Sequence, residues 1–131
     1  MTNLFQTDPK FMKKIFYLKT CDTCKRILKT FPTEGFEFQE IKTEPIKEEQ
    51  ISQLKELAGS YESLFSRRAK KYKEMGLKDV SLEESDYKHY ILSDYTFLQR
   101  PVIVIDKHVF IGSGKKNLEA LHQYLNTDSN S

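Results

Sequence analysis

Two cysteines stand three residues apart near the start of the chain, in the order Cys21-Asp22-Thr23-Cys24. A β-prone run precedes them and a helical pattern follows, so Cys21 is expected at or just before a helix N-terminus. Free backbone N–H groups and the positive end of the helix dipole stabilise a thiolate there and lower the pKa of the thiol. Cys24 comes one turn later on the same face, close enough to form a reducible disulfide. A Cys-x-x-Cys motif in this setting indicates redox or thiolate chemistry.

Two other interpretations of the cysteine pair remain open. Zinc prefers four ligands, but the chain has no second Cys-x-x-Cys, and His89, His108 and His122 show no paired spacing. We therefore expect no metal. The other alternative is that both cysteines are inert core residues.

Hydrophobic spacing predicts the elements that position these cysteines. Residues 15–18 form a short apolar run that suits a strand buried on both faces. Apolar positions at three-and-four spacing then predict a helix over residues 21–31, and Pro32 and Gly35 end it. Residues 36–41 nearly alternate and predict a second strand. Strand, helix and strand in under thirty residues form a βαβ unit with a parallel strand pair.

The rest of the chain predicts helices and then a hairpin. Residues 44–97 are helical and rich in surface residues, with helices over 46–58 and 61–76 and a third helix after a Ser81–Glu84 capping box. Residues 102–105 and 109–111 predict two strands joined by an Asp106-Lys107 turn. Gly112-Ser113-Gly114 then opens a final helix that carries Leu118, Leu121 and Leu125 on its inner face.

This order of elements predicts an α/β fold with a small mixed sheet and helices on both faces. It is the order of a thioredoxin-like (glutaredoxin-like) domain with a helical insertion at about residues 44–97. We expect a single domain over residues 13–126, an N-terminal extension over residues 1–12 and a flexible tail over residues 127–131.

Composition excludes several classes of protein. The 131 residues include 21 Lys and Arg against 19 Asp and Glu, for a net charge of +2. This charge is too small for a dedicated nucleic-acid binder. No window approaches 18 apolar residues, and the first ten residues lack an apolar signal segment. We expect a cytoplasmic monomer that binds neither nucleic acid nor a membrane.

Two groups of basic residues could bind an anion. Arg100-Pro101 directly precedes the strand over 102–105, and proline is acceptable at the first residue of a strand. In a thioredoxin-like domain this proline is expected to be cis and to face the catalytic cysteine, which puts Arg100 beside the thiolate. The planar guanidinium fork suits an oxyanion; the alternative is an ordinary turn arginine. The basic run over residues 67–71 is either a solvated helix face or the source of an arginine that reaches an anionic site.

Three segments resemble the ArsC/Spx family: residues 14–25, 72–77 and 98–104. The resemblance runs from about Lys13 to Leu125. The family comprises glutaredoxin-coupled arsenate reductases, Spx-type regulators that bind RNA polymerase, and thiol proteins of unknown substrate. Its fold is thioredoxin-like with a helical insertion, which agrees with the order of elements above.

The resemblance implies roles for particular residues. Cys21 would be the nucleophile that attacks arsenate, and Arg100 would cradle the oxyanion with a second arginine from the inserted helices. Arg68 or Arg67 matches that second arginine, and we prefer Arg68. We also assign Thr20, Thr23 and Pro101 to the substrate site.

The chain departs from the arsenate reductases at two places. Their third arginine would fall at or near Gly112-Ser113, where this chain has none. They use one catalytic cysteine and borrow glutathione, whereas Cys24 here supplies a second thiol, as in the Spx-type regulators.

The first hypothesis is therefore an arsenate reductase-like thiol oxidoreductase in which Cys24 resolves the adduct on Cys21. Its substrate would be an oxyanion such as arsenate, or a thiol or disulfide. Electrons would come from glutathione, glutaredoxin or thioredoxin, with no bound cofactor. The second hypothesis is an Spx-like redox sensor that binds RNA polymerase, and a third is a non-catalytic binding module.

Overall fold

The computed structural model describes residues 13–129, so the predicted extension over residues 1–12 lies outside the described residues. The chain forms two compact units. Of the described residues, the first unit combines residues 13–40 with residues 100–129, and the second unit is Ile41–Gln99. The sequence bounds of the second unit are close to those of the predicted helical insertion, about residues 44–97.

The first unit is built on a mixed four-stranded sheet of β2 (Lys13–Tyr17), β3 (Glu37–Glu40), β4 (Val102–Ile105) and β5 (His108–Ile111). The strand order is β3-β2-β4-β5. As predicted, β2 and β3 are parallel and are joined through helix α1 (Asp22–Leu28). The pairs β2–β4 and β4–β5 are antiparallel, and β4–β5 is the predicted hairpin.

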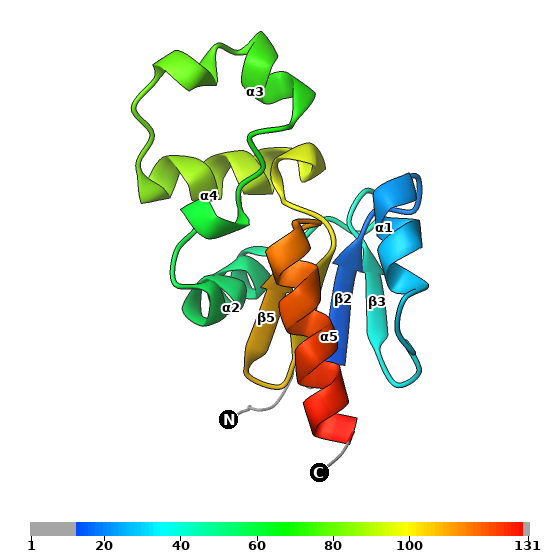
Figure 1. The fold of residues 1–131 in the computed structure, drawn as a ribbon. Coiled ribbons are helices and arrows are strands. Elements are labelled where there is room, and N and C mark those ends of the chain that lie inside the picture. The colour runs from blue at the N-terminus through cyan, green and yellow to red at the C-terminus, as the bar shows by residue number, and fades with distance from the viewer. Residues whose placement is uncertain (1–12, 130–131) are drawn as a thin grey trace. The chain divides into compact units, whose positions relative to one another are not determined.

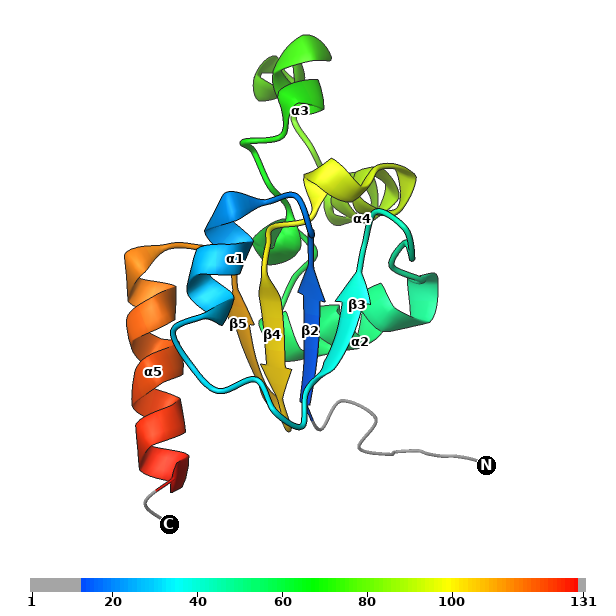
Figure 2. The ribbon, with the colours of Figure 1, turned by 90° about the vertical axis from the view of Figure 1, so that its right-hand side faces the viewer.

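Helices α1 and α5 (Lys115–Ser129) cover one face of this sheet, as Figure 2 shows. Ile15 at the centre of β2 pairs with Ile103 of β4 and faces this layer. The seven buried core residues between sheet and helices are Ile15, Ile27, Phe31, Ile103, Ile105, Phe110 and Leu121. All four residues of β4 are buried, as expected for a central strand with an uninterrupted apolar run.

The C-terminal boundary of the first unit differs from the sequence-based expectation. Helix α5 continues to Ser129, so residues 127–129 of the predicted flexible tail are helical. The polar residues there include no Gly or Pro to stop the helix. In the edge strand β3 the Phe38 side chain is 42% exposed and stands edge-on to Tyr17, while Gln39 is the buried residue.

The second unit consists of short helices (Figure 1). They are α2 (Glu48–Ala58), the 3₁₀ turn η1 (Glu62–Leu64), α3 (Lys70–Glu74), η2 (Leu77–Asp79), α4 (Glu84–Ser93) and η3 (Tyr95–Phe97). The buried Phe65 ring is central to this unit, because it stacks on Phe97 at 5.3 Å and meets Tyr87 edge-on at 5.0 Å.

Two predictions for the second unit are wrong. The single helix expected over residues 61–76 is interrupted, because Phe65 forms an antiparallel bridge with Leu98. The Ser66 N–H donates to the Phe97 carbonyl at 2.7 Å and so keeps this segment extended.

The second wrong prediction is the Ser81–Glu84 capping box. Glu83 is the N-cap of α4, and its N–H donates to Asp86 Oδ2 at 2.8 Å. The Glu84 carboxylate instead accepts hydrogen bonds from the Tyr61 and Glu62 N–H groups at 2.7 and 3.1 Å.

Within residues 13–129, no helix is long and apolar enough to cross a membrane.

Candidate active site

Cys21 lies where strand β2 gives way to helix α1, as predicted. It is the N-cap residue of α1 and has an extended backbone, with φ −89° and ψ 110°. Its Sγ atom accepts a hydrogen bond from the Cys24 N–H at 3.4 Å, and its carbonyl accepts the Lys25 N–H at 3.1 Å. The thiol therefore takes the place of the side-chain oxygen that usually caps a helix N-terminus.

The surroundings of Cys21 favour its thiolate. Burial alone would raise the pKa of this half-buried thiol. Hydrogen bonds from the Cys24 and Thr23 N–H groups and the positive charge of Arg100 act in the opposite direction and outweigh burial, so the pKa lies below its ordinary value.

Cys24 carries the same thiol group as Cys21, but its surroundings raise its pKa instead of lowering it. Its side chain is fully buried, and both cysteines are free thiols. Burial, together with the neighbouring Cys21 sulfur, raises the pKa of Cys24 to about 11. Cys24 is therefore a neutral thiol near pH 7, directly beside a thiol that ionises readily.

Arg100 and Pro101 stand at the start of β4, at the end of the sheet that carries Cys21. The Arg100–Pro101 peptide bond is cis, as predicted. Pro101 is buried, and its carbonyl accepts the Gly112 N–H at 2.8 Å. Arg100 is half-buried, with its Nε atom fully buried, and its charge lowers the pKa of Cys21.

The first unit thus brings together Cys21, Cys24, Thr23 and Arg100, with Pro101 directly after the arginine. Thr23 contributes its backbone N–H to the Cys21 sulfur, whereas Thr20 is exposed on the loop before Cys21. This arrangement can hold a nucleophilic sulfur, a second thiol and a cation close together.

Arg67 and Arg68 belong to the second unit and have different surroundings. Arg67 pairs with Glu62 at 2.8 Å, donates to the Tyr87 hydroxyl at 3.0 Å and has its pKa raised by the Glu62 hydrogen bond. The exposed Arg68 side chain makes no ion pair or hydrogen bond within the described part of the chain. Arg68 is thus the more available of the two arginines, and its predicted role at the oxyanion stays a prediction.

Sequence reasoning missed two side chains that brace the loops of the first unit. Glu40, at the end of β3, accepts the Lys19 N–H at 2.9 Å and so holds the loop before Cys21. Asn117, in the first turn of α5, bonds to the backbone of Ile111 and Gly112. Neither residue carries a motif, because each contact depends on where the chain returns in space.

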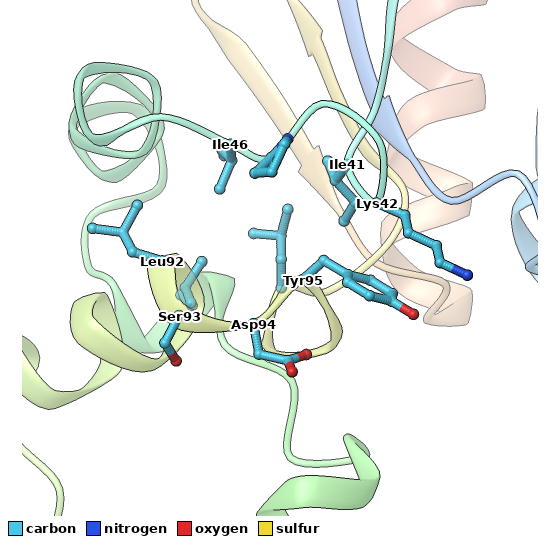
Figure 3. A pocket seen from close by; sticks show the side chains of 10 residues that line it. Ile41, Lys42, Ile46, Leu92, Ser93, Asp94 and Tyr95 are labelled. Atoms are coloured by element: carbon cyan, nitrogen blue, oxygen red, sulfur yellow. The ribbon is translucent and has the colours of Figure 1, made fainter.

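The second unit contains a pocket of about 210 Å³ that none of the eight predicted site residues lines (Figure 3). Its buried apolar lining includes Ile41, Ile46 and Ile91. Asp94 also lines it, but this carboxylate is already held by Lys71 Nζ at 2.6 Å and the Thr96 N–H at 2.9 Å. Among the described residues no group of three or more His, Cys, Asp or Glu side chains could hold a metal ion.

A family model described as the ArsC family matches residues 16–121. The chain belongs to the ArsC family. The matched segment contains Cys21, Cys24, Arg68 and Arg100, and it ends at Leu121 in the core of the first unit. No curated protein matches the chain.

Solved structures with the same fold belong to other ArsC-related proteins. An ArsC family related protein from Bacteroides fragilis is 17% identical, with a TM-score of 0.69 over 85% of this chain and 98% of its own. The arsenate reductase from Vibrio cholerae is 18% identical, with a TM-score of 0.64 over 84% and 95% of the two chains. An arsenate reductase related protein from Brucella melitensis is 19% identical, with a TM-score of 0.63 over 84% and 93%. These likenesses establish the thioredoxin-like α/β fold with its helical insertion.

The ArsC-family chain has Gly112 and Ser113 at the place that the resemblance assigns to the third arginine of the arsenate reductases. Gly112 follows β5 with a left-handed φ of 83°, a conformation that glycine adopts at little cost, and Ser113 is half-buried beside it. The basic side chains nearest in sequence are Lys115 and Lys116, both exposed in the first turn of α5. Among the described residues, Arg100 is a cation whose charge lowers the pKa of Cys21.

Proposed function

We propose that this ArsC-family chain is a thiol oxidoreductase that reduces an oxyanion such as arsenate, with Cys21 as the nucleophile and Cys24 as the resolving thiol. The observation that carries the proposal is the contrast between the two thiols. Cys21 is accessible and has a lowered pKa, whereas the fully buried Cys24 has a pKa of about 11. A nucleophilic thiol must be accessible and readily ionised, whereas a resolving thiol can stay protonated until the adduct has formed.

With arsenate the proposed reaction takes two steps. The Cys21 thiolate attacks arsenic, an Sγ–As bond forms, and one oxygen leaves as water after taking up protons. The Cys24 sulfur then attacks Cys21 Sγ, and the S–As bond breaks with its electron pair remaining on arsenic. The products are arsenite and a Cys21–Cys24 disulfide, so two thiols are oxidised and As(V) is reduced to As(III).

The electrostatics of the pair favour this order of steps. The Cys21 sulfur raises the pKa of Cys24, so Cys24 stays protonated while Cys21 is a thiolate. Forming the adduct removes the negative charge from Cys21, which lowers the pKa of Cys24 and prepares it to attack. Arg100 lies close enough to both sulfurs to stabilise the charge that develops on them.

Two further parts of the proposal come from the family resemblance. Arg68 would join Arg100 in binding the oxyanion, and Thr20, Thr23 and Pro101 would line the substrate site. The disulfide would be reduced by glutathione, glutaredoxin or thioredoxin. Arsenate is the first substrate to test because solved relatives of the same fold carry the name arsenate reductase.

The test is NADPH consumption with arsenate, glutathione, glutaredoxin and glutathione reductase. The wild type should show arsenate-dependent turnover, and Cys21→Ser should lose all of it. Cys24→Ser should accumulate a mixed adduct on Cys21 that mass spectrometry detects. Full turnover by the Cys21→Ser variant would contradict the mechanism. No turnover by a wild type whose Cys21 still reacts fast with a thiol probe would point to another oxidant.

A second candidate function is a redox sensor of the Spx type, in which the Cys21–Cys24 disulfide controls binding to RNA polymerase. The observation that favours it is the side-chain interaction between the Cys21 and Cys24 thiols, in a chain with Gly112 and Ser113 at the place of a third arginine. Pull-down with the polymerase α subunit under oxidising and reducing conditions separates the two candidates. Redox-dependent capture without arsenate turnover would favour the sensor.

A further inference from the structure

The Asn117 side chain fastens the end of strand β5 to the start of helix α5. Its Oδ1 atom accepts the Ile111 N–H at 3.1 Å, and its Nδ2 atom donates to the Gly112 carbonyl at 2.9 Å. The amide therefore uses both its donor and its acceptor on two consecutive residues. Asn117 is half-buried, so water competes only partly for these bonds.

The segment that Asn117 holds is bonded in turn to the start of β4. The Gly112 N–H donates to the Pro101 carbonyl at 2.8 Å, and the adjacent residues Ile111 and Val102 are paired in the β4–β5 ladder. Gly112 has a left-handed φ of 83°, so its two peptide planes are turned away from the path of the strand. The two Asn117 bonds hold the peptide planes on either side of the Ile111–Gly112 plane, which carries the Gly112 N–H. They therefore restrain this N–H in its direction toward the Pro101 carbonyl.

Arg100 is the residue directly before Pro101. Its backbone position depends on the Pro101 end of β4, and its guanidinium acts on Cys21 from there. Hydrogen bonds and one peptide link thus connect Asn117 with the cation beside the nucleophile, through Gly112 and Pro101.

We propose that Asn117 is a positioning residue for the active site: it holds the Gly112 turn against Pro101 and thereby keeps the Arg100 guanidinium next to the Cys21 sulfur. The proposal rests on the proposed function only in taking Cys21 as the reactive thiol. Alanine at this position removes both bonds, and serine is too short to span both partners.

The test follows the rate of Cys21 alkylation by iodoacetamide as a function of pH, in a Cys24→Ser background that leaves one thiol. Asn117→Ala should move the midpoint of the profile to higher pH and slow alkylation at pH 6 by roughly threefold, since the thiolate is the reacting species. Gln123→Ala, which removes an exposed neutral amide from the same helix, should leave the profile unchanged.

A double-mutant cycle with Arg100→Met separates positioning from a general loss of structure. If Asn117 acts through Arg100, Asn117→Ala should add no further shift once Arg100 is replaced. Shifts that add, or an unchanged profile in a folded Asn117→Ala protein, would overturn the proposal. Should the alanine variant fail to fold by circular dichroism, Asn117→Ser must show the same upward shift.

Alkylation needs no substrate or electron donor, so this result does not depend on arsenate turnover. A wild-type midpoint at the ordinary thiol value would contradict the proposed function itself. A lowered midpoint that Asn117→Ala leaves in place would contradict only the role of Asn117.

Discussion

Cys21 and Cys24 share one motif, but their environments make them different reagents. The Cys21 sulfur caps a helix N-terminus, where two N–H groups and an arginine stabilise its charge. The Cys24 sulfur lies one turn deeper, in a fully buried position where a charge would lose its solvation. One helical turn thus separates a thiol that ionises readily from a buried thiol that stays protonated.

Arg67 and Arg68 allow a test at the level of single residues, because the Arg67 side chain has contacts within the second unit that the Arg68 side chain lacks. Arg67→Ala removes the Glu62 ion pair and the Tyr87 hydrogen bond, and it should lower the free energy of unfolding by about 0.5 kcal/mol because the pair is half-exposed. Arg68→Ala should leave that free energy unchanged and weaken the protection of Cys21 by arsenate against alkylation. Urea unfolding and the alkylation rate measure the two effects.

The opposite pattern of results in the two arginine variants would contradict this assignment. If Arg67→Ala abolishes arsenate protection while Arg68→Ala leaves it intact, then Arg67 is the oxyanion ligand and our preference for Arg68 is wrong. Arg68→Lys keeps the charge but loses the planar fork, so it should restore protection only in part.

At the scale of elements, the residue Asp94 connects three helices of the second unit. It lies between α4 and η3 in the chain, and its carboxylate pairs with Lys71 of α3. Burial alone would raise the pKa of Asp94, but its bonds to Lys71 and Thr96 outweigh burial and lower the pKa to about 2. The carboxylate caps η3 by accepting the Thr96 N–H, and it pairs with Lys71 at 2.6 Å.

Because the pKa of Asp94 is lower in the folded chain than in the unfolded chain, its contribution to stability is complete above about pH 4. It is lost as the pH falls from about 4 to about 2. Asp94→Asn keeps an N-cap oxygen but loses the ion pair with Lys71, so it should cost about 0.5–1 kcal/mol at pH 7 and much less at pH 2. Urea unfolding at the two pH values measures this difference, with the exposed Asp79→Asn as control; an equal cost at both values would contradict it.

The elements also show what the sequence could and could not predict. The β2–α1–β3 unit was predictable because its hydrophobic periods are local and because cysteine, proline and glycine mark its boundaries. The interruption at Phe65 was not, since it depends on a bridge to Leu98 that lies far along the chain. For the same reason the motifs indicated Cys21, Cys24 and Arg100, but nothing local indicated that Asn117 reaches back to Gly112.

At the scale of the whole molecule, the first unit is discontinuous in sequence. Its parallel pair β2–β3 precedes the second unit, and its hairpin β4–β5 follows it. Cys21 and Arg100 therefore meet only because β2 and β4 are neighbours in the sheet. The folded second unit is thus the connection between β3 and β4.

This connectivity couples the stability of the two units through the chain. If residues 41–99 unfold, the first unit must close a flexible loop of about 60 residues, which costs roughly 3–4 kcal/mol. Ile91 is buried in the second unit, and Ile91→Ala should destabilise that unit by about 2–5 kcal/mol. The most protected amides of β2 and β4 should then exchange faster, although the substitution lies outside their unit. The exposed Lys73→Ala should change neither set of amides, and wild-type exchange in β2 and β4 of the Ile91→Ala variant would show that the first unit is stable without its insertion.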